Sequence, residues 1–318
     1  MANMSAVVFT KGGPENLVVE SIERPEPGPT EVLVRVDAVG VNPIDWKTRS
    51  GAGVYANFDP SSPMVLGWDI AGIVEGAGAG VTRFRKGDRV FGMPRFPEPV
   101  GAYAEFVTAP SRQLARIPDG VADLAAAAVP LSGLTAYQAM VDTLRVGRGD
   151  RVLIHGAGGN VGQFAVQIAK ARRADVWATE VPERQDTLKA LAVDHVINTQ
   201  IDDFAAVATG MDAVLDLVGS EDSATRSLRT LRDGGRLVVL SSPDDLPSQD
   251  RVPETNVTAS WMLVEPDYAG LEALAAMLEF GLLKVSLGET RALSEVGALH
   301  TIGEAGEVTG RLVATVRV

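Results

Sequence analysis

The stretch from Arg151 to Lys170 constrains the fold more than any other part of the chain. It reads RVLIHGAGGNVGQFAVQIAK, a short apolar run, then a glycine-rich turn, then a segment with helical periodicity. Ala157, Gly159 and Gly162 occupy the small-residue positions of the A-x-G-x-x-G turn that joins a strand to a helix around a dinucleotide. In order, these small residues allow a tight turn, close approach of the backbone to a pyrophosphate, and close packing of the helix on the strand. The order of strand, turn and helix predicts a dinucleotide-binding βαβ unit.

The start of the helix after this turn is the predicted phosphate site. The first N–H groups of a helix have no partner within it and carry a partial positive charge, so they attract phosphate. The residues expected to face the phosphates are Gly158, Gly159, Asn160 and Val161.

Composition narrows the functional classes. The 318 residues contain no cysteine, which excludes disulfides, thiolate metal ligands and a cysteine nucleophile. His155, His195 and His300 are far apart in the sequence, so no metal site is expected. The net charge of -12, without any basic block, argues against nucleic acid or an anionic membrane as partner. The N-terminus lacks the features of a signal peptide, and no apolar run is long enough to span a membrane. We therefore expect a cytoplasmic protein that works without a metal.

The predicted secondary structure differs between the first part of the chain and the part that follows. Up to Asp123 it shows short strand-like runs separated by turns rich in glycine and proline, which predicts a compact β-barrel. From Arg151 onward strand-like and helix-like segments alternate, which predicts a doubly wound parallel sheet. The run Arg311–Arg317 returns to strand character and is expected to complete the first domain. The predicted domains are therefore 1–123 with 285–318 for the barrel, and 124–284 for nucleotide binding.

One polar segment falls between these features. Asn42–Gly51 reads NPIDWKTRSG and gathers amide, carboxylate, indole and ammonium groups after a strand. A simple polar turn accounts for this composition as well, because Asn-Pro favours turns.

Eight short motifs together resemble the medium-chain dehydrogenase/reductase superfamily, in its zinc-free quinone oxidoreductase branch. They occur in the family's order over nearly the whole chain: Val41–Asp45, Gly67–Val74, Lys86–Val90, Tyr103–Phe106, Leu134–Ala136, Gly156–Gly162, Asp216–Gly219 and Gly310–Val313. The resemblance implies a GroES-like β-barrel catalytic domain and a Rossmann domain, an α/β protein overall.

The chain departs from the zinc alcohol dehydrogenases of this superfamily. Val39–Asn42 replaces the segment with their metal-binding cysteine, and Gly67-Trp68-Asp69 stands where they carry Gly-His-Glu. Without zinc to polarise a carbonyl, alcohol–ketone chemistry loses its Lewis acid. The resemblance instead implies hydride transfer from NAD(P)H to a quinone or to an alkene conjugated to a carbonyl. Charge then develops on an oxygen that hydrogen-bond donors can stabilise.

The resemblance also implies site residues in the barrel domain. Asn42 is expected near the nicotinamide ribose and the substrate. Lys47 is a candidate donor to the developing enolate, and Tyr55 a candidate donor or proton source. For Lys47 an ion pair with Asp45 is the alternative, and for Tyr55 simple packing.

Further cofactor contacts are expected from the second domain. The resemblance puts Thr135 against the nicotinamide and Val218 in the cofactor site, and Ser241 and Ser242 follow the carboxyl end of a predicted strand, where ligands of such sheets bind. For the two serines a plain loop cap is equally compatible.

The choice between NADPH and NADH rests on the segment after the second strand. Thr179 and Arg184 suit a 2′-phosphate, and the branch usually prefers NADPH, which is our expectation. Glu180 favours NADH, because it lies about 20 residues after Gly159, where an acidic residue binds the ribose 2′-OH and repels a phosphate.

The expected protein is thus an NADPH-dependent reductase of quinones or α,β-unsaturated carbonyls, and the family suggests a homodimer. Two alternatives stay open. One is an enoyl reductase of a biosynthetic pathway, and the other is a non-catalytic NAD(P)H-binding regulatory protein on the same fold.

Overall fold

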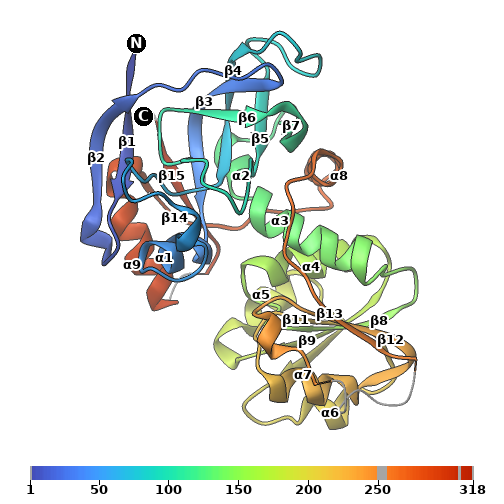
Figure 1. The fold of residues 1–318 in the computed structure, drawn as a ribbon. Helices are drawn as coiled ribbons and strands as arrows, with labels where there is room; N and C mark the ends of the chain where they lie inside the picture. The colour runs from blue at the N-terminus through green and yellow to red at the C-terminus, as the bar shows by residue number, and fades with distance from the viewer. Residues whose placement is uncertain (1, 249–255, 307–308, 317–318) are drawn as a thin grey trace. The chain divides into compact units, whose positions relative to one another are not determined.

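The computed structural model describes residues 2–248, 256–306 and 309–316. These residues form two compact units, one made of Met1–Leu134 with Glu265–Val318 and the other of Thr135–Val264 (Figure 1).

The first unit is built on a mostly antiparallel sheet. Its strands, in spatial order, are β14 (Leu287–Ala292), β15 (Arg311–Thr315), β3 (Glu31–Val41), β4 (Asp69–Ala77), β5 (Arg89–Gly92) and β7 (Leu114–Arg116), with β6 (Phe106–Pro110) also paired to β3 and a separate hairpin of β1 (Asn3–Phe9) and β2 (Leu17–Glu23). The C-terminal strand β15 pairs with β3 in this sheet.

The helices of this unit are α1 (Pro43–Arg49), α2 (Asp123–Ala127), α8 (Tyr268–Glu279) and α9 (Val296–Ala305). The polar turn considered for the Asn42 segment is in fact the start of α1. Asn42 caps this helix, Pro43 occupies its first turn, and the Asp45 carboxylate accepts the backbone N–H of Asn42. Proline and a capping box both favour a helix start, and this pairing overrides the turn tendency of Asn-Pro.

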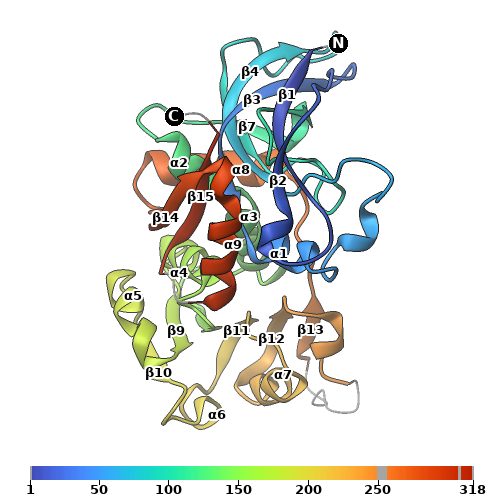
Figure 2. The same ribbon diagram turned by 90° about the vertical axis from the view of Figure 1, so that its left-hand side faces the viewer.

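The second unit contains a six-stranded parallel sheet. Its strands, in spatial order, are β10 (His195–Asn198), β9 (Asp175–Glu180), β8 (Arg151–His155), β11 (Met211–Asp216), β12 (Leu231–Val239) and β13 (Thr258–Trp261). Its helices are α4 (Asn160–Ala171), α5 (Gln185–Ala190), α6 (Phe204–Val207) and α7 (Glu221–Leu228). Figure 2 shows β11, β12 and β13 side by side. The strand order turns back between β8 and β11, and ligands of such sheets bind at this switch point. The predicted doubly wound sheet is confirmed.

A longer helical segment and several single 3₁₀ turns connect these elements. Helix α3 (Pro130–Tyr137) continues into a π-helical stretch at Gln138–Thr143. Single 3₁₀ turns lie at Pro14–Asn16, Tyr55–Asn57, Ser111–Gln113, Pro182–Arg184, Pro243–Asp245 and Leu293–Glu295.

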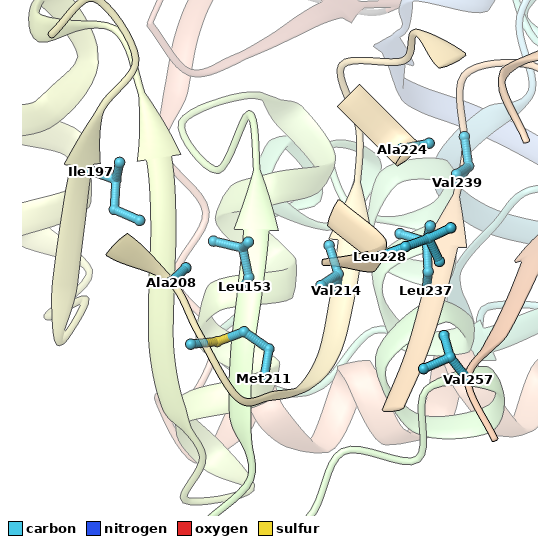
Figure 3. Close-up of a cluster of buried hydrophobic side chains, with 10 residues drawn as sticks. All are labelled: Leu153, Ile197, Ala208, Met211, Val214, Ala224, Leu228, Leu237, Val239 and Val257. Carbon is cyan, nitrogen blue, oxygen red and sulfur yellow. The ribbon is translucent and has the colours of Figure 1, made fainter. Parts of the chain in front are cut away.

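An apolar cluster supports the sheet of the second unit (Figure 3). Leu153, Val214 and Leu237 come from three neighbouring strands, and Leu228 of α7 packs against the same cluster. Full burial of such a side chain contributes about 1.5–3 kcal/mol each. The cluster therefore fixes the strands whose carboxyl ends carry the polar residues described below.

The compact units are divided at other positions than the predicted domains. The sequence prediction assigned 124–284 to nucleotide binding, whereas 124–134, with α2, and 265–284, with α8, lie in the first unit. For α8 the reason is local packing, since Arg83 pairs with Glu272 of α8 and lies over the ring of Tyr268.

Candidate functional site

The glycine turn has the geometry that the sequence predicts for phosphate binding. Strand β8 ends at His155 and α4 begins at Asn160, with Gly159 as its N-cap. Within the described chain no side chain caps this helix, so its first N–H groups stay available for a ligand. A Cβ on Gly162 would lie 2.5 Å from the carbonyl oxygen of Gly156. Only glycine therefore lets α4 pack this closely on the turn.

A carboxylate from β9 is part of the same turn. The N–H of Gly158 donates to Oε2 of Glu180 over 2.7 Å, and the N–H of Val181 donates to Oε1 over 2.9 Å. A Cβ on Gly158 would lie 3.2 Å from Cβ of Arg184. The structure thus places Glu180 and Arg184, two of the residues that the sequence analysis weighed for the ribose 2′ position, next to Gly158 of the turn.

Thr179 points elsewhere. It is buried, and its hydroxyl is 2.9 Å from Nδ1 of His155, whose Nε2 is 3.0 Å from Oγ of Ser227. Burial lowers the pKa of His155, so this histidine is neutral near pH 7. The predicted contact of Thr179 with a 2′-phosphate would require its hydroxyl to leave His155.

The ends of β11 and β12 carry the remaining predicted contacts in this unit. The side chain of Val218 is exposed, and the N–H groups of Val218 and Gly219 donate to Oδ1 of Asp216. Ser241 donates to Oδ2 of Asp245, and Ser242 accepts the N–H of Asp244. Because the strands are parallel, these loops lie at the same edge of the sheet as the glycine turn. The serine contacts also fit the plain loop cap that the sequence left open.

Thr135, predicted to lie against the nicotinamide, is a buried residue of α3. Its role stays a prediction.

Asn42 lies in a buried polar cluster of the first unit. Its Nδ2 donates to Oδ2 of Asp69 over 2.9 Å, and Nη2 of Arg311 donates to its Oδ1 over 2.7 Å. Ser132 adds a longer contact to the same Oδ1, at 3.4 Å. Asn42 and Asp69 are fully buried and Arg311 is 3% exposed. The amide is therefore held between a carboxylate and a guanidinium, and its predicted contact with a ligand requires movement of the groups that cover it.

A second chain of hydrogen bonds reaches Asn42 through Asp45. Nη1 of Arg49 lies 3.1 Å from Nδ1 of His300, and Nε2 of His300 lies 3.0 Å from the hydroxyl of Tyr103. Arginine can only donate, so Nδ1 of His300 accepts and Nε2 carries the proton. Tyr103 then donates to Oδ2 of Asp45, which also accepts the backbone N–H of Asn42.

Burial sets the protonation of this cluster. It raises the pKa of Asp45 to about 8, with a smaller contribution from the charge of Asp69. Burial also raises the pKa of Asp69 to about 7, against the opposing effect of Arg311. The pKa of His300 is lowered to about 3, by burial and then by Arg49, so His300 is neutral at physiological pH.

The other two predicted catalytic residues lie outside this cluster. Lys47 is exposed on α1. The alternative ion pair with Asp45 is not formed, because Asp45 is buried against Asn42 and Tyr103. Tyr55 is half-buried, with its ring 6.4 Å from that of Phe9. Both residues follow β3 closely in the chain, and their catalytic roles stay predictions.

Trp68 takes the place at which zinc enzymes of the resembled superfamily carry a ligand. It is fully buried, packs against Phe58 and Phe96, and donates from Nε1 to the carbonyl oxygen of Glu98 over 2.8 Å. It is therefore a packing residue.

The residues that the structure describes contain neither a candidate metal site nor a membrane-spanning helix. Across 2–248, 256–306 and 309–316 no group of three or more His, Asp or Glu side chains is placed to hold a metal ion. None of the helices in these ranges is long and apolar enough to cross a membrane.

Comparison with known proteins identifies relatives over the whole chain. Residues 28–119 match the alcohol dehydrogenase GroES-like domain family, and 191–313 match the zinc-binding dehydrogenase family. A 2-haloacrylate reductase from Burkholderia sp is 32% identical over 98% of this chain and 98% of its own length. The structure of a quinone oxidoreductase from Coxiella burnetii is 33% identical, with a TM-score of 0.89 over 99% of this chain and 100% of that one.

One relative is much longer. A mycocerosic acid synthase-like polyketide synthase from Mycobacterium tuberculosis is 33% identical over 99% of this chain. The chain spans only 15% of the length of that protein.

Proposed function

The chain belongs to the medium-chain dehydrogenase/reductase superfamily, in its zinc-free quinone oxidoreductase branch, and we propose on this basis that it reduces quinones or α,β-unsaturated carbonyl compounds with NAD(P)H. The observation that carries the proposal is the glycine turn, in which no side chain caps the first N–H groups of α4 and Gly162 has no room for a side chain. This arrangement fits a pyrophosphate.

When bound, the reduced nicotinamide supplies a hydride. The residues of the chain have three tasks around it. The N–H groups of Asn160 and Val161 at the start of α4 bind the diphosphate. Gly158 and Gly159, whose N–H groups donate to Glu180 and to the carbonyl oxygen of Gly156, let the backbone come close to it. Donors in the first unit stabilise the negative charge that develops on the substrate oxygen. The exposed ammonium of Lys47 and the hydroxyl of Tyr55 are the candidates for that donation and for delivery of the proton. A zinc ion has no part in this scheme.

We propose NADPH as the reductant, with Arg184 as the partner of the 2′-phosphate. A specific observation favours NADH as the second candidate, since the Glu180 carboxylate is fixed at the turn by the N–H groups of Gly158 and Val181. A carboxylate in this place accepts a hydrogen bond from a ribose 2′-OH and repels a phosphate.

Two variants separate these candidates. If NADPH is the cofactor, Arg184→Gln lowers kcat/KM with NADPH by roughly 10-fold and leaves the value with NADH nearly unchanged. If NADH is the cofactor, Glu180→Gln raises kcat/KM with NADPH and lowers it with NADH. Lys189→Gln, which removes an exposed lysine paired with Asp186 on the neighbouring helix, is the charge-matched control.

The reaction itself is tested by following oxidation of the reduced cofactor with a quinone, an enone, a 2-haloacrylate and an enoyl thioester, before and after dialysis against a chelator. Turnover that survives dialysis supports the proposal, and turnover that requires added zinc contradicts it. Tight NADPH binding without turnover of any compound supports a regulatory nucleotide-binding protein instead.

The enoyl thioester is included for a specific reason. The match to a polyketide synthase over almost the whole chain favours an enoyl reductase of a biosynthetic pathway as the second candidate activity. A kcat/KM for the thioester well above that for quinones supports that candidate.

A further inference from the structure

We propose that Arg311 and Asp69 are positioning residues that fix the amide of Asn42 so that it meets a bound ligand only as a hydrogen-bond donor. The inference rests on the proposed function in one respect, the approach of Asn42 to substrate or cofactor.

The orientation of the amide follows from the chemistry of its two partners. A guanidinium has only N–H donors, so the Asn42 atom 2.7 Å from Nη2 of Arg311 must be the oxygen. The other amide atom, 2.9 Å from Oδ2 of Asp69, is then the nitrogen, which donates to this carboxyl oxygen. Turning the amide over would place N–H against N–H at Arg311. The guanidinium therefore selects one of the two orientations of the amide, and Asp69 supplies the acceptor that matches it.

The two partners are placed by the sheet on either side of Asn42. Strand β3 ends at Val41, directly before Asn42, and lies between β4 and β15. Asp69 opens β4 opposite Gly40, and Arg311 opens β15 next to Leu312, which is opposite Val41. The amide is thus held from two neighbouring strands of a sheet core rather than from loops.

Arg311 is itself held in this position. Its Nε donates to the carbonyl oxygen of Ala128 over 2.8 Å, and its Nη2 lies 3.7 Å from Oδ2 of Asp69. Within the described residues its Nη1 has no hydrogen-bond partner although it is buried. A buried guanidinium with an unsatisfied donor is costly, which is expected where its place is set by a function rather than by stability alone.

Arg311 and Asp69 together form what we call the Asn42 clamp. The clamp leaves Asn42 a single hydrogen-bonding group for a ligand. Its Oδ1 accepts from Arg311 and one N–H of Nδ2 donates to Asp69, so the second N–H remains. That N–H is complementary to an oxygen, such as a substrate carbonyl that gains negative charge or a ribose hydroxyl. The hydroxyl of Ser132 donates to the same Oδ1 over 3.4 Å, and the partners on β4 and β15 hold the orientation of the amide without it.

A double-mutant cycle on Arg311 and Asn42 tests the proposal. Arg311→Met removes the donor to Oδ1 at similar length, Asn42→Ala removes the amide, and the double variant combines them. We expect Arg311→Met to lower kcat by roughly 10- to 100-fold, since misplacing a catalytic group has effects of this size. The double variant should be no slower than Asn42→Ala alone, because Arg311 acts through Asn42. Arg311→Lys keeps the positive charge and one donor, and it should recover part of the lost kcat.

Arg95→Met is the matched control. Arg95 is a partly buried arginine of the same unit that pairs with Glu31 and Thr108, far in sequence from Asn42. Its loss should lower stability and leave kcat nearly unchanged. The proposal would be overturned if the reductions of kcat by Arg311→Met and Asn42→Ala multiplied in the double variant. It would also be overturned if folded Arg311→Met and Arg311→Lys had the kcat of the wild type.

A second measurement does not depend on turnover. The side-chain amide of Asn42 gives a pair of ¹⁵N–¹H signals, assigned by their absence in Asn42→Ala. We expect them to be shifted and protected from exchange in the wild type and to lose both properties in Arg311→Met. Unchanged signals in Arg311→Met contradict the clamp, whereas an inactive wild type with altered signals contradicts only the proposed function.

Discussion

The two candidate binding regions use opposite physical means. In the second unit the glycine turn offers backbone N–H groups from one continuous segment above an apolar cluster. In the first unit the surroundings of Asn42 consist of side chains from distant parts of the chain, with carboxylates and guanidinium groups enclosed in the interior. The glycine turn requires residues without a Cβ, such as Gly162. The polar cluster requires that each buried charged or polar group has a partner.

This difference predicts which substitutions each region tolerates. The turn tolerates changes of side chains that point away from it and does not tolerate an added Cβ at Gly162. The polar cluster has the opposite sensitivity, because removing one partner leaves another charge buried without compensation.

Asp69→Ala should have the largest effect on stability. It leaves Arg311 buried without its carboxylate and also removes the acceptor for Nδ2 of Asn42. Breaking a buried pair on one side costs about 3–5 kcal/mol. We expect a loss of unfolding free energy of this size, which urea denaturation would measure.

Glu75→Ala is the control, since Glu75 lies on the same strand β4 but pairs with Lys86 at the surface. Exposed pairs contribute about 0–1 kcal/mol. Equal losses for Asp69→Ala and Glu75→Ala would show that burial does not set the cost of breaking these pairs.

The same contrast explains what could be predicted from the sequence. The glycine turn is contiguous, so its strand, turn and helix were predicted directly, and Glu180 was recognised by its spacing from Gly159. The fold class followed from the alternation of elements.

The polar cluster has no such local pattern. Asp45, Tyr103, His300 and Arg311 come from four separate elements or loops, and only the folded sheet brings them to Asn42. The motifs Val41–Asp45, Gly67–Val74, Tyr103–Phe106 and Gly310–Val313 contain Asn42 and four of its neighbours in the cluster. A motif does not say which side chains of other motifs it will contact, so the partners could not be assigned.

Helix α1 was considered as a turn because Asn42-Pro43 favours turns locally. The contact that makes it a helix is the capping box between Asn42 and Asp45, which is visible in the sequence as spacing. Helix α9 was not predicted, although its buried residues Val296, Leu299 and His300 recur at helical spacing.

Gly162→Ala should have the next largest effect. The new Cβ would lie 2.5 Å from the carbonyl oxygen of Gly156 and 2.6 Å from Cα of Ala157, both backbone atoms that cannot move without moving the turn. We expect a loss of about 1–3 kcal/mol in stability, and a loss of at least about tenfold in affinity for the reduced cofactor, measured by fluorescence titration.

Gly147→Ala is the matched control near the other end of β8, because a Cβ there would meet only Oδ2 of Asp150, at 3.8 Å. Cofactor affinity that is equal in the two variants would contradict the role of the turn.

The pH dependence of stability tests the protonation of the polar cluster and should show the smallest effect. The pKa of Asp45 is about 8 in the folded protein, against 3.8 as its ordinary value, so the folded state holds a proton that the unfolded state releases. Its contribution to stability therefore falls as pH rises toward 8. His300, with a pKa of about 3 against 6.5, contributes the opposite slope, but only below about pH 6.5.

The useful window for Asp45 is thus pH 6.5 to 8. Asp45→Asn keeps an oxygen that accepts from the N–H of Asn42 and from Tyr103, and it removes the titration. Relative to the wild type, the variant should gain about 1–2 kcal/mol of unfolding free energy across this window, since each proton contributes up to about 1.4 kcal/mol per pH unit.

Asp186→Asn is the control, because Lys189 lowers the pKa of this exposed carboxylate and its titration ends far below the window. A difference between Asp45→Asn and wild type that stays constant from pH 6.5 to 8 would mean that Asp45 is ionised throughout, and that the enclosed charges are balanced differently from those described here.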